Sequence, residues 1–252
     1  MHPDWLIPDW HARGVGAVMT TRRGGFSQAP FDSMNIRDGL GDDTEAVHSN
    51  QRLLAETIGA TPVYLNQVHG TTVVRLTAAD LRPGAPVHDA DASVTTEPGI
   101  ACTAQVADCL PVLFAAPGAV GAAHAGWRGL AAGVVEAALK AVCEAASCSP
   151  DQVQTWLGAS IGPTRFEVGV DVLDAFNVHP AVTSLRFKPH AEGKWMADLP
   201  GLARDRLSAL GVRSVSGGHW CTVDDAPRFF SFRRDRVTGR MVAVAWLTGP
   251  AR

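Results

Sequence analysis

Three short segments each place a metal-binding side chain among small residues. NQVHG contains His69, VADCLP contains Cys109 and AAHAGWRG contains His124. Two imidazoles and one thiolate suit zinc best among the common metals, and copper accepts the same donors. The separations along the chain match no short zinc-finger pattern, so this hypothesis depends on the chemistry of the donors. Three protein ligands leave a fourth tetrahedral position open, which is typical of a catalytic zinc site.

Cys109 has two other interpretations. It stands at the head of the apolar run LPVLF, and cysteine is one of the residues most often buried as packing. It could also be the nucleophile of a cysteine hydrolase, activated by His124 or His69. His124 lies among alanines and a glycine at the end of a predicted strand, where packing gives little reason for a histidine.

The segment GWRGLAAG suggests a phosphate site. Gly126 would let the backbone approach a ligand, and Arg128 adds positive charge beside the N-terminus of a helix expected to begin near Leu130. No full P-loop pattern is present, so the glycine could simply form the turn, with Arg128 a surface residue.

Two other segments have less specific signals. Glu167, in GASIGPTRFEVG, is a candidate general acid or base at the substrate, although a single loop glutamate is more often solvated. Asp89 and Asp91 favour a turn or cap, without a chemical role. The arginine-rich segment RFFSFRRDRVTGR is an anion site or, as we slightly prefer, a solvated β-hairpin closed at Thr238 and Gly239.

The elements that must position these residues are mostly short strands. Apolar and β-branched runs predict strands at residues 15–20, 63–68, 72–76, 92–96, 101–106, 111–115, 120–124, 153–157, 213–216 and 241–247. Helical periodicity predicts helices at residues 44–58, 130–146, 170–176 and 199–210, the second without a breaker. This mixture predicts an α/β (α+β) fold with more than one layer of sheet. His124 then lies at a strand-to-turn-to-helix corner, where ligand sites often form.

Length and composition narrow the class of protein. The 252 residues, 46% hydrophobic and 19% charged, predict one folded domain over residues 1–252. A net charge of −3 does not favour a nucleic-acid or anionic-membrane partner. MHPDWLIPDW has no features of a secretory signal, and no apolar run is long enough to span a membrane. Five cysteines then indicate reduced thiols and a cytoplasmic location.

Seven motifs together resemble the YfiH family, which has also been labelled laccase-domain proteins, multicopper polyphenol oxidases and peptidoglycan editing factors. The motifs are GGFS at Gly24, NQVHG at Asn66, DADA at Asp89, ADCLPVL at Ala107, HAGWRG at His124, GPTRFEVG at Gly162 and FFSFRRDRVTGR at Phe229. The resemblance runs from about Thr20 to Leu247 and implies layered mixed sheets flanked by helices. It also implies zinc bound by His69, Cys109 and His124.

The resemblance implies phosphorolysis of adenosine, inosine and methylthioadenosine, together with adenosine deamination. Purine nucleoside and phosphate would then be the small-molecule partners. Phe232 stands where the family often has Tyr, and Thr164, Arg165 and Phe166 replace a common Cys-Tyr pair, which affects the expected substrate pocket. Copper-dependent polyphenol oxidation is less favoured, because none of the nine histidines forms a His-x-His pair. A nucleoside-binding module without turnover is a further alternative.

Overall fold

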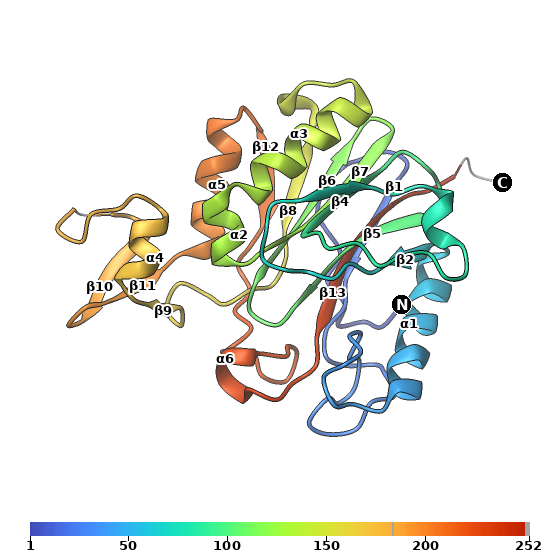
Figure 1. The fold of residues 1–252 in the computed structure, drawn as a ribbon, viewed down its shortest axis with the longest axis horizontal. Coiled ribbons are helices and arrows are strands. Elements are labelled where there is room, and N and C mark those ends of the chain that lie inside the picture. Colours follow the sequence, from blue (N-terminus) through green and yellow to red (C-terminus); the bar gives the residue numbers. More distant parts are fainter. Residues whose placement is uncertain (183, 250–252) are drawn as a thin grey trace.

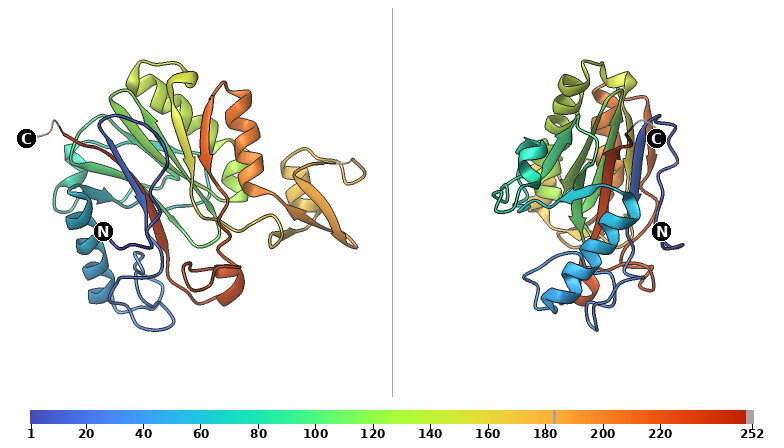
Figure 2. Two further views of the ribbon diagram at one scale, coloured as in Figure 1. Left: turned by 180° about the vertical axis from the view of Figure 1, so that it is seen from behind. Right: turned by 90° about the vertical axis from the view of Figure 1, so that its right-hand side faces the viewer.

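The computed structural model describes residues 1–182 and 184–249. Two sheets lie face to face, and helices cover their outer faces (Figures 1 and 2). The predicted α/β fold with several layers of sheet is therefore confirmed. No helix within these residues is long and apolar enough to cross a membrane.

The larger sheet has six strands and carries two of the candidate metal ligands. In spatial order its strands are β12 (Ser214–Gly217), β8 (Gln154–Leu157), β6 (Leu110–Ala116), β7 (Ala119–Ala125), β4 (Ala92–Thr95) and β3 (Val73–Arg75). The central strands β6 and β7 form an antiparallel hairpin and are buried along their whole length. A strand buried on both faces reads as a continuous apolar run, as LPVLFAA does.

The second sheet has four strands, in the order β1 (Val15–Met19), β13 (Met241–Leu247), β5 (Ile100–Val106) and β2 (Thr61–Val63). Side chains of β13 alternate between its two faces. Met241, Ala243 and Ala245 pack toward the six-stranded sheet, whereas Val242 and Val244 pack toward α1 (Thr44–Ile58). The second sheet therefore contributes to two hydrophobic layers.

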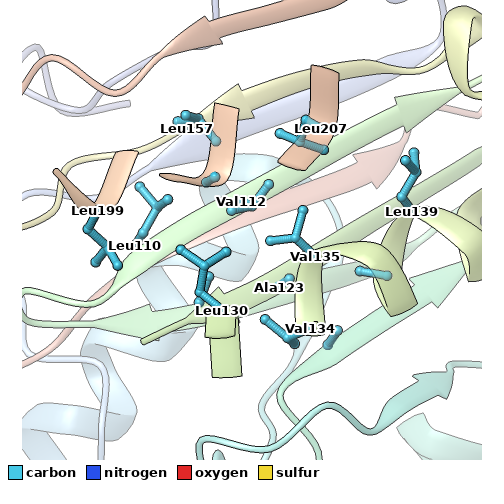
Figure 3. Packing of buried hydrophobic residues seen from close by; sticks show 14 of the residues in the cluster. Leu110, Val112, Ala123, Leu130, Val134, Val135, Leu139, Leu157, Leu199 and Leu207 are labelled. Carbon is cyan, nitrogen blue, oxygen red and sulfur yellow. The ribbon is translucent and has the colours of Figure 1, made fainter. Parts of the chain in front are cut away.

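Helices cover the other face of the six-stranded sheet. They are α2 (Trp127–Ala132), α3 (Val134–Ala146) and α5 (Leu199–Ala209), and their leucines and valines pack on β6, β7 and β8 (Figure 3). The smaller elements are α4 (Val170–Ala175), α6 (Phe232–Asp235) and the 3₁₀ turns at Ala78–Leu81 and Pro150–Gln152. A small sheet of β10 (Phe187–Ala191), β11 (Lys194–Ala197) and β9 (Glu167–Val168) projects to one side (Figure 1).

The prediction of one helix over residues 130–146 was wrong. The helical region begins at Trp127, and Gly133 divides it into α2 and α3. Gly133 has a φ of 103°, a left-handed conformation that glycine adopts at little cost, and its N–H caps α2 on the carbonyls of Gly129 and Leu130. Arg128 consequently lies inside the first turn of α2 and not before the helix.

Candidate metal centre

The structure brings His69, Cys109 and His124 together, with their ligand atoms within 4.8 Å of one another. Cys109 Sγ lies 3.8 Å from His69 Nε2, and the two imidazole rings meet edge to face with centroids 4.8 Å apart. His124 is near the end of β7, and Cys109 directly precedes the adjacent strand β6. His69 comes from the loop that precedes β3.

The loops carrying His69 and Cys109 hold unusual backbone conformations. His69 has a φ of 62°, and Asp108, the neighbour of Cys109, has a φ of 95°. Such values are uncommon for residues other than glycine, and they often occur at functional sites. The Asp108 carboxylate is held by Thr222 Oγ1 at 2.5 Å and by the N–H of Arg233 at 2.6 Å. These bonds anchor the turn that presents Cys109.

Gly126 allows the side chains of His69 and Cys109 to lie close to its backbone. A Cβ at this position would lie 2.7 Å from His69 Cδ2 and 3.0 Å from Cys109 Sγ, closer than a methyl group can pack. The predicted close approach at Gly126 is therefore present, but it is an approach to the candidate ligands. The N-cap glycine of α2 makes room for the site.

Asp91 connects two of the three candidate ligands. Its side chain is fully buried and accepts hydrogen bonds from the N–H groups of Val68, His69 and Gly70. It also lies 2.8 Å from His124 Nδ1. Burial raises the pKa of Asp91, but the bonds from His124 and the loop amides outweigh it and hold the pKa below its usual value. From the sequence we predicted no chemical role for Asp91, and this was wrong, because Asp91 bonds both His124 and the loop of His69.

The donor set fits a metal ion. Burial raises the pKa of Cys109, yet the charge and hydrogen bonds of His124 and His69 outweigh it and lower that pKa to about 6. A thiolate is the form of cysteine that binds metal. The bond between His124 Nδ1 and Asp91 leaves Nε2 as its free nitrogen, the arrangement common for histidine ligands.

Two cavities meet at this cluster. The first, of about 350 Å³, is lined by Arg37, Gln67, Gln105 and Arg240 together with all three candidate ligands. The second, of about 300 Å³, is lined by Arg128, Arg233 and Arg236 together with the rings of Trp127 and Phe166. The two cavities adjoin, because both are lined by His69, Ala107, Cys109 and Phe232.

The five arginines of these cavities share one property. None of them has a carboxylate within ion-pair distance in the part of the chain that the structure describes, although arginines elsewhere, such as Arg186 and Arg206, do. The one acidic residue of the cavity walls is Asp108, whose carboxylate is already hydrogen-bonded. The cavities therefore carry excess positive charge at the metal cluster.

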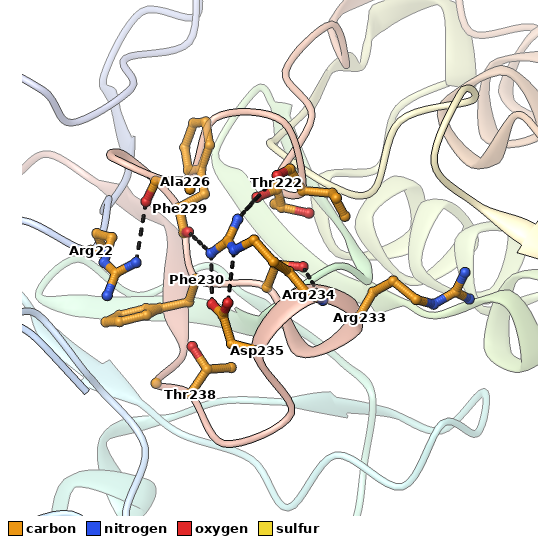
Figure 4. A network of polar contacts seen from close by, with 12 residues as sticks. Arg22, Thr222, Ala226, Phe229, Phe230, Arg233, Arg234, Asp235 and Thr238 are labelled. Carbon is orange, nitrogen blue, oxygen red and sulfur yellow. Dashed lines mark hydrogen bonds and ion pairs between the residues drawn. The ribbon is translucent and has the colours of Figure 1, made fainter. Parts of the chain in front are cut away.

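The arginine-rich segment forms a helical turn, so the preferred prediction of a β-hairpin was wrong. Ser231 caps α6 by accepting from the N–H of Arg234, and the chain turns back before β13. The Arg234 guanidinium points inward to the carbonyls of Thr222 and Phe229 and to Asp235, whereas Arg233 extends away from this network (Figure 4). Arg234 therefore stabilises the turn. The other arginines of this segment that line a cavity are Arg233 and Arg236 in the second and Arg240 in the first.

Of the two other predicted site residues, Arg128 lines a cavity and Glu167 does not. Arg128 lines the second cavity with its guanidinium 4.2 Å above the Trp127 ring. Glu167 is exposed on β9, with its carboxylate 3.6 Å from His190 Nε2, and it lines neither cavity. Its carbonyl accepts a hydrogen bond from Arg233 Nη1.

Known proteins resemble this chain over nearly its whole length. The family described as multi-copper polyphenol oxidoreductase laccase matches residues 16–248. A purine nucleoside phosphorylase of Pseudomonas aeruginosa is 48% identical over 96% of this chain and 98% of its own. The Escherichia coli protein YfiH, also named a purine nucleoside phosphorylase, is 44% identical over 96% of this chain and 98% of its own.

Solved structures also resemble this chain over nearly its whole length. A Neisseria meningitidis protein, 42% identical, superposes with a TM-score of 0.88 over 98% of this chain and 100% of its own. YlmD of Geobacillus stearothermophilus, 33% identical, gives a TM-score of 0.90 over 97% of this chain and 96% of its own.

Proposed function

The chain belongs to the YfiH family of laccase-like proteins, and we propose that it is a zinc-dependent purine nucleoside phosphorylase. The observation that carries this proposal is a group of five arginines around His69, Cys109 and His124 that form no ion pair with a carboxylate of residues 1–182 or 184–249. Phosphorolysis needs a phosphate anion held beside the anomeric carbon of the nucleoside, and such arginines are suited to hold it. Relatives of this chain are named purine nucleoside phosphorylases, which supports the same reaction class.

We assign inorganic phosphate to the cavity of Arg128, Arg233 and Arg236. Its aromatic walls, Trp127 and Phe166, are suited to stack against a purine base. In the reaction the bond between the base nitrogen and the anomeric carbon breaks, and a phosphate oxygen bonds to that carbon. The base leaves with the bonding electrons and takes up a proton. Glu167 contributes in this proposal through the carbonyl that holds Arg233.

The proposed metal ligands are His69, Cys109 and His124, with Asp91 orienting His124. A zinc ion there would supply a Lewis acid beside the reacting groups. Adenosine deamination is the second activity we propose, in which water replaces the amino group at C6 and ammonia leaves. It is supported by the three-residue donor set, which leaves a tetrahedral ion one position open to solvent or substrate. Copper is the alternative metal for these donors.

We also propose a cytoplasmic location. All five cysteines are free thiols in the structure, and disulfides are rare in a reducing compartment.

The decisive experiment incubates metal-analysed protein with adenosine, with and without phosphate, and identifies the products. We expect about one zinc per chain, adenine and ribose 1-phosphate only when phosphate is present, and inosine in either case. Alanine substitution of His69, Cys109 or His124 should lower zinc content and both activities, whereas Cys148→Ala, outside the cavities, should not. Zinc-loaded protein that forms neither product would refute the proposal, and a covalent adduct on Cys109 would support a cysteine hydrolase instead.

A further inference from the structure

Arg37 and Arg240 lie in the first cavity, apart from the three arginines assigned to inorganic phosphate. Phe232 lines both cavities and lies near one arginine of each. The Arg240 guanidinium lies 5.9 Å from the centre of its ring, and the guanidinium of Arg236 from the other cavity lies 5.7 Å from it. The positive charge at the metal cluster therefore extends over both cavities, with two arginines in the first and three in the second.

One buried residue positions both arginines of the first cavity. Asn35 is fully buried, and its Oδ1 accepts from the N–H of Arg37 at 3.2 Å and from the N–H of Arg240 at 2.9 Å. Its Nδ2 donates to the carbonyl of Arg37 at 3.1 Å. Arg37 and Arg240 are far apart in sequence, so Asn35 fixes the distance between two backbones that the chain itself does not connect. The arginine pair is built into the fold.

Neither arginine of this pair forms an ion pair with a carboxylate among the residues that the structure describes. Arg240 Nη1 donates to the carbonyls of Thr238 and Gly239 but contacts no carboxylate among the described residues. Burial, and then the neighbouring charge of Arg37, lower the pKa of Arg240, and together they outweigh the charges of Cys109 and Asp108, which raise it. Two partly buried like charges held side by side repel each other, and a bound anion would remove this repulsion.

We propose that Arg37 and Arg240 form a second anion subsite, which binds the 5′-phosphate of a purine nucleotide while inorganic phosphate occupies the cavity of Arg128. This rests on the proposed function, because a nucleoside that reacts at its anomeric carbon beside the metal cluster must direct its 5′ end away from the attacking phosphate. The two cavities share His69, Cys109 and Phe232, so a nucleoside at the metal cluster can extend from one cavity into the other. Purine nucleoside 5′-monophosphates would then be ligands of this chain as well as free nucleosides.

The test compares inosine with inosine 5′-monophosphate by titration calorimetry of the zinc-loaded protein in phosphate-free buffer. Inosine has no amino group at C6 and is not cleaved without phosphate, so binding is measured without turnover. We expect the monophosphate to bind at least about tenfold more tightly, the effect of one charge-assisted contact. Arg37→Gln and Arg240→Gln should each reduce this ratio to about threefold or less, whereas Arg240→Lys should retain part of it.

Two variants serve as controls. Arg82→Gln removes an exposed arginine outside both cavities, and Arg128→Gln removes one from the other cavity. Both should keep the wild-type ratio of the two affinities. Saturating inorganic phosphate should not displace the monophosphate if the subsites are separate.

Equal affinities for inosine and its monophosphate in the wild-type protein would overturn the proposal. Unchanged ratios in both Arg37→Gln and Arg240→Gln, or competition between inorganic phosphate and the monophosphate, would also overturn it. Ribose 5-phosphate separates this proposal from the proposed function. If it binds in a manner that depends on Arg37 and Arg240 while inosine does not bind, the anion subsite stands and the nucleoside function fails. If neither ligand binds, both fail.

Discussion

Replacing Asp91 by Asn tests whether this carboxylate holds the metal site in shape. Asp91 Oδ1 bonds the His69 N–H at 2.9 Å and His124 Nδ1 at 2.8 Å, and Oδ2 bonds the amides of Gly70 at 2.6 Å and Val68 at 3.2 Å. Asparagine has nearly the same shape but only one acceptor oxygen. In either orientation, its amide group faces donors that the carboxylate accepted.

The loss can be estimated from these bonds. If the Asn oxygen keeps the hydrogen bonds from His124 and the His69 amide, the two charge-assisted bonds from the amides of Val68 and Gly70 are lost. Each is worth about 1.5–3 kcal/mol. The sum, about 3–6 kcal/mol, is a large share of a typical unfolding free energy of about 5–15 kcal/mol. In the opposite orientation the amide donates toward His124 Nδ1, which moves the imidazole proton to the nitrogen needed for the metal. Residues in this position typically contribute about 10- to 100-fold to metal affinity.

Two assays measure these effects separately. Urea unfolding of the zinc-free protein gives the change in stability, and competition with a chromophoric chelator gives the change in zinc affinity. Asp89→Asn is the matched control, since Asp89 is exposed and its bond from Asn66 can form equally with an amide oxygen. The reasoning is refuted if Asp91→Asn behaves like Asp89→Asn in both assays. If Asp91→Asn lowers stability but leaves zinc affinity unchanged, Asp91 holds the loop but does not orient His124 for the metal.

Three further predictions concern other positions. Gly126→Ala should weaken zinc binding without unfolding the protein, whereas Gly249→Ala, with open space around its Cα, should not, as measured by chelator competition. Arg128→Ala should raise the phosphate concentration needed for nucleoside cleavage by about 10- to 150-fold and spare deamination, and equal loss of both activities would contradict its role. Hydrogen bonds and charge from Arg186 hold the pKa of Asp205 below its usual value, so this pair stabilises the fold above the unfolded pKa of about 3.9 and stops doing so as the pH falls through the folded pKa. Asp205→Asn should therefore cost at most about 1 kcal/mol at pH 7, and this cost should shrink as the pH falls through the folded pKa of Asp205, as measured by urea unfolding.

Local sequence was sufficient to predict an element when the residues that determine its limits lie within or next to it. The helix over residues 44–58 has the predicted limits, because Asp43 caps its first turn and Gly59 ends it in a left-handed conformation. The three candidate ligands could be selected because small residues surround each of them, and the structure places them together. Gly133 was the local signal that we overlooked, although a glycine in a helical run is a common place for a helix to end.

Long-range contacts determine the features that were not predicted. The segment HDADAS gives no sign that Asp91 will bond a loop more than 20 residues earlier and a histidine on another strand. Arg37 joins the site because Asn35 bonds the backbone of Arg240. Neither relationship appears as a pattern along the chain. The contacts of Asp91 and the pairing of Arg37 with Arg240 therefore became visible only in three dimensions.

The position of β13 has a consequence for synthesis of the protein. This strand lies between β1 and β5, and the ribosome makes it more than a hundred residues after either partner. Until it emerges, β1 and β5 of the nascent chain each expose an unpaired edge to which another polypeptide can add. Arg240 directly precedes β13, so the electropositive wall of the site is completed only when this strand inserts. A chain that ends before residue 241 would therefore have an open sheet and an incomplete first cavity, and its free strand edges would be a target for chaperones.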